Sequence, residues 1–130
     1  MIRLKDTWCK GGRPRDVPIT NDRQREVLAR AAELAEHGSM ILAHLSYRDQ
    51  LKRYSWATES AGLAKLHGLR HAYAQRRYAE IAGWPAPVAG GPNRRQLTPE
   101  QRKTDYDARM TVSSELGHGR EEITAVYLGR

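Results

Sequence analysis

The pattern of apolar and polar residues predicts a short β-hairpin at the beginning of the chain. Two apolar segments, residues 2–4 and 17–19, flank the sequence Lys-Gly-Gly-Arg-Pro-Arg at residues 10–15. Glycine and proline interrupt regular structure, so this sequence is expected to form a turn between two strands. The hairpin therefore has a basic tip.

Apolar residues at steps of three and four predict helices along the next part of the chain. The first helix is expected to be capped by Asn21 and to end at Gly38. A second helix is expected to begin near Ser46, which forms a plausible capping pair with Asp49, and to end at Gly62. Both predictions rest on local capping chemistry and helical periodicity.

The C-terminal half is also predicted to be helical, with one interruption. A third helix is expected over residues 69–82, followed at residues 83–96 by a Pro/Gly-rich loop that we expect to be exposed. Thr98 opens a capping box before a long helix that ends near Gly117, and a short helix follows at residues 121–128. The predicted fold class is α+β, mostly helical, with an N-terminal hairpin and about five helices.

The net positive charge of the chain favours nucleic acid as a binding partner. Lysine and arginine outnumber aspartate and glutamate by 22 to 15 in the 130 residues, which gives a formal net charge of +7. Such an excess attracts a polyanion, because binding releases the counterions that its phosphates hold. Nucleic acid is therefore the leading class of expected partner.

Other features of the composition favour a cytoplasmic setting. Cys9 is the only cysteine, so the chain has no internal disulfide framework. No apolar run approaches the roughly 20 residues of a membrane span, and the N-terminus lacks the apolar stretch of a signal peptide. We expect no association with a membrane.

A metal- or nucleotide-dependent enzyme is the remoter alternative. His67 and His71 lie four residues apart and could share a metal ion, but neither His118 nor Cys9 shows a ligand spacing typical of zinc. The sequence at residues 10–12 lacks the remainder of a phosphate-loop motif. No metal or other cofactor is therefore expected.

Four local signals follow one another in a fixed order along the chain. They are the hairpin with Lys10, the motif His-Gly-Leu-Arg-His at residues 67–71, the motif Leu-Gly-His-Gly at residues 116–119, and Tyr127, nine residues after His118. In this order they resemble the catalytic half of the tyrosine recombinases, the family of phage integrases and chromosome-dimer resolvases. The resemblance implies that residues 1–130 are the C-terminal part of such a catalytic domain, encoded by a bacterium or phage and associated with the nucleoid.

The resemblance also implies a reaction. The residues that fall on the family's catalytic positions are Lys10, His67, Arg70, His118 and Tyr127. It implies that Tyr127 attacks a DNA phosphate, displaces the 5′-oxygen and forms a 3′-phosphotyrosyl link, which a second strand later reverses. The implied activity is site-specific recombination or integration, carried out by protomers that assemble on double-stranded DNA.

The residue types suit these implied roles. A guanidinium such as that of Arg70 can bind phosphate oxygens with two parallel hydrogen bonds. A tyrosine hydroxyl with a pKa of about 10 needs a proton acceptor, for which His67 is the candidate, while His118 is expected to donate to a phosphate oxygen. Lys10 is the expected general acid for the leaving 5′-oxygen.

Further side chains of the motifs are expected to contact DNA without reading its sequence. These DNA-binding candidates are Arg13, Arg15 and His71. Aromatic residues elsewhere receive no site role, because aromatic side chains on helices usually serve packing. Those expected to lie in the core or to anchor loops are Tyr47, Tyr54, Trp56 and Trp84.

One catalytic residue of the family has no counterpart. The family places a first arginine well upstream of the lysine hairpin, and the only arginine before Lys10 is Arg3, which lies in a predicted strand. Loss of one of two guanidiniums at a phosphoryl transition state costs several kcal/mol, so we expect the isolated chain to cleave DNA poorly. A non-catalytic, DNA-binding remnant of an integrase is the main alternative.

Overall fold

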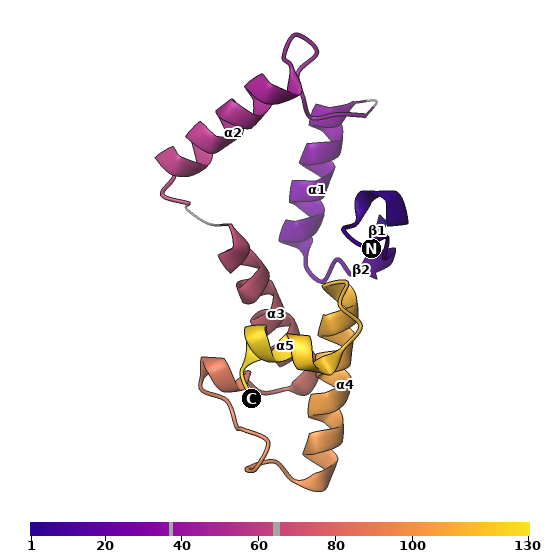
Figure 1. Cartoon of the computed structure of the whole chain (residues 1–130), viewed down its shortest axis with the longest axis vertical. Coiled ribbons are helices and arrows are strands. Elements are labelled where there is room, and N and C mark those ends of the chain that lie inside the picture. The colour runs from indigo at the N-terminus through magenta and orange to yellow at the C-terminus, as the bar shows by residue number, and fades with distance from the viewer. Residues whose placement is uncertain (37, 64–65) are drawn as a thin grey trace. The chain divides into compact units, whose positions relative to one another are not determined.

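The computed structural model describes residues 1–36, 38–63 and 66–130, and confirms the predicted fold class (Figure 1). The described residues form mostly helices, together with one antiparallel pair of strands near the N-terminus. The chain divides into two compact units: one joins Met1–Val17 to His67–Arg130, and the other is Pro18–Leu66. The predicted site residues all belong to the first of these units.

The unit Pro18–Leu66 contains two helices, α1 (Asp22–Ala35) and α2 (Tyr47–Ser60). The predicted caps are confirmed: the side chains of Asn21 and Ser46 each accept a hydrogen bond from the backbone N–H three residues further on, at 2.9 and 3.2 Å. Helix α1 ends at Ala35 and not at the predicted Gly38. Local capping chemistry therefore fixes where both helices begin.

The aromatic residues of α2 do not form a core. Tyr47, Tyr54 and Trp56 are 72%, 50% and 71% exposed, so the expectation that they pack in the interior is wrong. Neither α1 nor α2 contains a buried residue of any kind. An apolar side chain on a helix is buried only where a facing element covers it.

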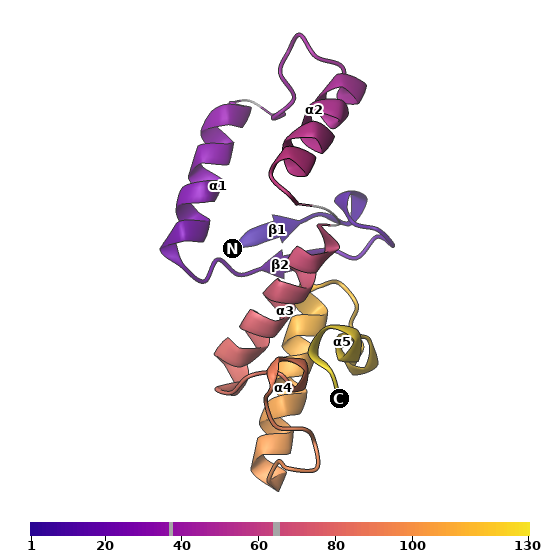
Figure 2. The same cartoon turned by 90° about the vertical axis from the view of Figure 1, so that its left-hand side faces the viewer.

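The other unit begins with the hairpin, whose strands are β1 (Ile2–Leu4) and β2 (Arg15–Val17) (Figure 2). The strands are antiparallel, and Leu4 pairs with Arg15. The second strand was predicted two residues too late, at 17–19, where Pro18 has no N–H to donate to a ladder. Arg15 consequently lies in a strand and not in the turn.

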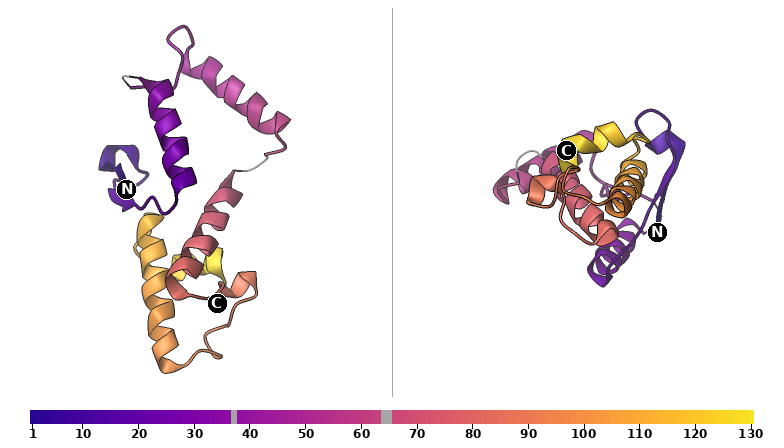
Figure 3. Two further views of the ribbon diagram at one scale, coloured as in Figure 1. Left: turned by 180° about the vertical axis from the view of Figure 1, so that it is seen from behind. Right: turned by 90° about the horizontal axis from the view of Figure 1, so that it is seen from below.

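Three helices follow in this unit: α3 (His67–Ala82), α4 (Pro99–Glu115) and α5 (Glu121–Leu128). Helix α3 begins two residues before its predicted start, whereas α5 has its predicted bounds. The capping box predicted at Thr98 is present at the start of α4. Helices α3 and α4 lie side by side, and α5 packs against both of them (Figures 1 and 3).

The core of this unit lies between the three helices. Helix α3 buries a residue at every fourth position, and the buried apolar residues of α4, Ala108 and Val112, have the same spacing, so one apolar stripe of each helix faces the core. Alanines in both stripes allow the two helices to approach closely. The residues of the buried apolar cluster are Ala74, Tyr78, Ala82, Ala86, Ala108, Val112, Leu116, Tyr127 and Leu128.

Most residues of the segment 83–96 are exposed, as predicted, but the segment also contributes to the core. Ala86 is fully buried, and a short 3-10 helix, η2 (Pro87–Ala89), packs against α5. A side chain at Gly91 would overlap the carbonyl of Pro85, so the turn requires a glycine at this position. The proline and glycine residues therefore shape a loop that covers part of the core.

A buried polar network joins α4 to the C-terminal end of α5. Asp105 accepts hydrogen bonds from Arg109 Nε, at 2.9 and 3.0 Å, and from the hydroxyl of Tyr78. Arg109 Nη1 also donates to the carbonyl of Gly129 at 2.9 Å, just beyond α5. Burial, followed by the hydrogen bond to Asp105, raises the pKa of Tyr78 to about 12, so its phenol stays protonated as a donor.

No helix in the described part of the chain combines the length and apolar character that crossing a membrane would require.

Candidate functional site

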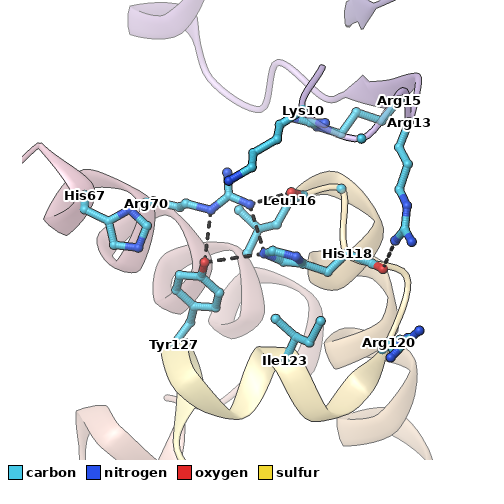
Figure 4. Close-up of a pocket in the computed structure, with 12 residues that line it drawn as sticks. Lys10, Arg13, Arg15, His67, Arg70, Leu116, His118, Arg120, Ile123 and Tyr127 are labelled. Atoms are coloured by element: carbon cyan, nitrogen blue, oxygen red, sulfur yellow. Dashed lines mark hydrogen bonds between the residues drawn. The ribbon is translucent and has the colours of Figure 1, made fainter. Parts of the chain in front are cut away.

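One pocket collects nearly all of the predicted site residues (Figure 4). It lies where the hairpin, the start of α3, the turn between α4 and α5, and α5 itself come together. All of the predicted residues line it except His71: the lining side chains among them are Lys10, Arg13, Arg15, His67, Arg70, His118 and Tyr127. Segments more than 100 residues apart in sequence, such as those containing Arg13 and His118, therefore meet here.

The centre of the pocket is a direct contact between Arg70 and Tyr127. The phenol oxygen of Tyr127 accepts a hydrogen bond from Arg70 Nε at 3.1 Å. Tyr127 is only 5% exposed, so most of its ring is packed in the core while its hydroxyl reaches the pocket. The guanidinium carbon of Arg70 lies 5.8 Å from the centre of the same ring.

Arg70 also binds the turn after α4. Its Nη2 donates to the carbonyl of Leu116 and lies 3.1 Å from Nε2 of His118 (Figure 4). An arginine nitrogen can only donate, so Nε2 of His118 is the acceptor in this contact. One guanidinium thus fixes the relative positions of a phenol, a carbonyl and an imidazole.

Interactions outside the pocket set the spacing of its helices. Glu115 accepts hydrogen bonds from the hydroxyl of Tyr73 at 2.7 Å and from Arg77 Nε at 3.1 and 3.2 Å, which joins α3 to α4. Gln75 Nε2 donates to the backbone carbonyl of Tyr127 at 3.2 Å, which joins α3 to α5. These contacts hold the helices that carry Arg70 and Tyr127.

The turn that carries His118 is held from two sides. Ser113 accepts a hydrogen bond from the N–H of Arg120 at 2.9 Å and donates to its carbonyl at 2.7 Å, which closes the turn. Arg13 of the hairpin donates to the carbonyl of His118. Gly117 has a φ of 80°, a backbone conformation that a residue with a side chain adopts only at a cost.

The imidazole of His118 faces the phenol of Tyr127. Its Nε2 lies 3.4 Å from the phenol oxygen of Tyr127. Burial, and then the charges of Arg70, Arg13 and Arg15, lower the pKa of His118 from its ordinary value of 6.5, which favours the neutral imidazole near pH 7. The sequence did not indicate this contact, because it depends on the shape of the turn after α4.

The remaining predicted residues surround this centre. The imidazole rings of His67 and His71 lie 6.3 and 4.7 Å from the ring of Tyr127, measured between centroids. No hydrogen bond joins His67 to the phenol among the described residues, so its role as proton acceptor stays a prediction. Lys10 is exposed in the turn of the hairpin and extends toward Arg70 (Figure 4).

A metal ion has no evident binding group in the part of the chain that the structure describes, since no three His, Cys, Asp or Glu side chains gather there. The rings of His67 and His71 do lie close together, with their centroids 5.5 Å apart.

The titration of His118 tests this arrangement. We expect its NMR titration midpoint to lie below 6.5, and the Arg13→Gln variant to shift it upward by removing one of the nearby positive charges. Arg3→Gln, which removes an exposed arginine of the same hairpin, should leave the midpoint unchanged. A midpoint at or above 6.5 in the unmodified protein would contradict the geometry.

The lowered pKa of His118 makes the free energy of unfolding depend on pH. Unfolded His118 binds a proton more readily than folded His118, because the pKa is lowered in the folded state. Its contribution to the free energy of unfolding is therefore present above pH 6.5 and is lost as the pH falls below that value.

Comparison with known proteins gives one finding. A family model described as Integrase matches residues 7–76, which are 70 of the 130 residues. The matched segment contains Lys10, His67 and Arg70, and it ends before the turn with His118 and before Tyr127. Searches of curated proteins and of solved structures found no match.

Proposed function

This chain belongs to the integrase family, and we propose that it performs the chemistry of a tyrosine-type site-specific recombinase. In this proposal Tyr127 is the nucleophile that cleaves and rejoins DNA strands. Residues 1–130 act as the C-terminal part of the catalytic domain, together with other protomers on double-stranded DNA. The net charge of +7 supports a polyanionic partner.

One observation carries the proposal. Tyr127 and Arg70, 57 residues apart in sequence, place a phenol oxygen and a guanidinium nitrogen 3.1 Å apart in a pocket. A tyrosine buried for packing alone has no need of a basic pocket around its hydroxyl. A nucleophile that attacks a phosphate needs such a pocket, because negative charge grows on the phosphate oxygens during the reaction.

The reaction can be written from the residues of the pocket. The phenol oxygen of Tyr127 forms a bond to phosphorus while the bond from phosphorus to the 5′-oxygen breaks. The phenol proton passes to a histidine, and the distance of 3.4 Å supports His118 Nε2 as the acceptor. Lys10 supplies a proton to the departing 5′-oxygen, and Arg70 stabilises the charge on the non-bridging oxygens.

The products of this step conserve the phosphodiester bond energy in a 3′-phosphotyrosyl link. Attack by the 5′-hydroxyl of another strand reverses the step and joins that strand to the DNA. The proton movements then run in the opposite direction, so the residues return to their starting states. No external energy source enters the balance.

A covalent protein–DNA adduct is the expected result of a cleavage assay. The substrate is a pool of nicked duplexes with randomised sequence, in which the short fragment beyond the cut is lost and religation is prevented. We expect an adduct that forms slowly and survives a denaturing gel, and we expect Tyr127→Phe to abolish it, because phenylalanine has no nucleophilic oxygen.

Tyr47→Phe is the matched control, since Tyr47 is 72% exposed and lies on α2, outside the pocket. It should form the adduct as the unmodified chain does. An adduct that persists in Tyr127→Phe removes Tyr127 from the mechanism. Salt-dependent retention on duplex DNA without any adduct would instead favour a non-catalytic DNA-binding role.

A further inference from the structure

The two hairpin arginines of the pocket differ in what they contact. Arg13 is exposed in the turn, and its guanidinium donates to the carbonyl of His118. Arg15 is half-buried in strand β2, where its backbone pairs with that of Leu4. Arg15 is therefore held by a rigid element, whereas Arg13 lies in a turn and its side chain supports the His118 turn.

The guanidinium of Arg15 lies against the backbone of Gly117. A Cβ built at Gly117 would be 2.5 Å from Nη1 and 3.0 Å from Cζ of Arg15, so only a glycine leaves room for this contact. Gly117 lies between Leu116, which Arg70 binds, and His118. The contact therefore places a second guanidinium beside the turn at the centre of the pocket (Figure 4).

Arg15 has an unused donor. Its Nε is buried from solvent and has no hydrogen-bond partner among the described residues. No carboxylate of the described chain lies within salt-bridge distance of Arg15, although its neighbour Asp16 pairs with Arg3 at 3.4 Å. A buried donor without a partner costs free energy, which a bound acceptor can recover.

Arg70 cannot meet the needs of a bound phosphate by itself. Its Nε and Nη2 are occupied by Tyr127, Leu116 and His118, so the edge of the guanidinium formed by these two nitrogens is not free for bidentate binding. A phosphodiester in this pocket therefore needs another donor. Among the arginines that line the pocket, Arg15 is the one whose Nε is buried and has no hydrogen-bond partner among the described residues.

We propose that Arg15 is the second phosphate-binding guanidinium of this pocket and acts with Arg70 on one phosphodiester. The inference rests on the proposed function, and it gives Arg15 a more specific role than a sequence-independent contact with the DNA backbone. The ligand class is a phosphate diester with one negative charge. The arginine and lysine side chains that line the pocket come from the hairpin (Lys10, Arg13 and Arg15), from α3 (Arg70) and from the turn before α5 (Arg120).

NMR of arginine side chains tests this proposal without requiring cleavage. The full chain is titrated with dimethyl phosphate, a simple phosphodiester, while the Nε–H resonances are recorded; Arg15→Lys identifies the Arg15 signal by its disappearance. We expect the Arg15 Nε–H resonance to shift in a saturable manner. We also expect Arg15→Gln to weaken binding about tenfold, the usual loss for a charge-assisted hydrogen bond.

Arg3→Gln is the control, because it removes the same charge from the same hairpin at a side chain that is 83% exposed. It should bind dimethyl phosphate as the unmodified chain does. A shift of the Arg70 resonance with a fixed Arg15 resonance overturns the inference and leaves the proposed function standing. If neither resonance moves, the inference fails and the proposed phosphate site fails with it.

Discussion

Replacement of Arg70 by lysine should slow adduct formation by roughly 100- to 1,000-fold, the usual effect of losing one donor that stabilises a transition state. Lysine keeps the positive charge but offers one ammonium in place of the planar fork. It therefore cannot bind Tyr127, Leu116 and His118 together as Arg70 does. The rate is measured with a nicked duplex recovered from the randomised pool.

Arg76→Lys provides the matched control on the same helix. Arg76 is about half exposed and contacts Glu80 at 3.6 Å, away from the pocket. Its replacement should leave the rate unchanged, and retention on duplex DNA should be similar for both variants because neither alters the net charge. An Arg70→Lys rate within a few-fold of the unmodified chain would show that the fork has no catalytic role.

Replacement of Arg109 by methionine should lower the free energy of unfolding by about 3–5 kcal/mol, the typical cost of leaving one partner of a buried ion pair uncompensated. Arg109 and Asp105 are 5% and 6% exposed, and Arg109 Nε lies 2.9 Å from the carboxylate. The variant also loses the hydrogen bond to Gly129, which anchors the end of α5. Chemical denaturation measures the effect.

Two further variants test whether burial of the ion pair causes the loss of stability. Lys103→Met breaks a pair with Asp107 that has the same four-residue spacing on α4 but is exposed, so it should change stability little. Adding Asp105→Leu to Arg109→Met removes the stranded carboxylate and should recover much of the lost stability. A small effect of Arg109→Met alone would contradict the role assigned to the network.

The helices could be predicted from the sequence because short-range interactions determine them. Asn21, Ser46 and Thr98 cap helices through bonds to residues three positions away, and such bonds can be recognised in the sequence. The 3.6-residue periodicity then indicates how far each helix extends. Both features are present before any tertiary contact forms.

Features that depend on tertiary contacts were harder to predict. The second strand begins at Arg15 because its backbone pairs with Leu4, and apolar pattern alone placed it two residues late. Trp56 is exposed because no described element of its unit covers it. Ala86 is buried because the loop folds back onto the core, which its proline and glycine content did not reveal.

The site, like the fold, could be predicted only where local sequence signals determine it. The sequence identified seven of the twelve residues that line the pocket, because the motifs and the basic hairpin tip are local sequence signals. The motifs could not show that Nε and Nη2 of Arg70 bind groups of the protein itself. They also could not show that His118 faces the phenol of Tyr127. These contacts set which donors remain for a phosphate, and they depend on how α3 and the turn after α4 pack together.

Mapping the covalent bond tests the central claim most directly. The adduct formed with the nicked duplex is digested with nuclease and protease, and mass spectrometry locates the residue that retains a nucleotide. We predict that the nucleotide is attached through its 3′-phosphate to the phenol oxygen of Tyr127. A nucleotide on any other side chain would contradict the account.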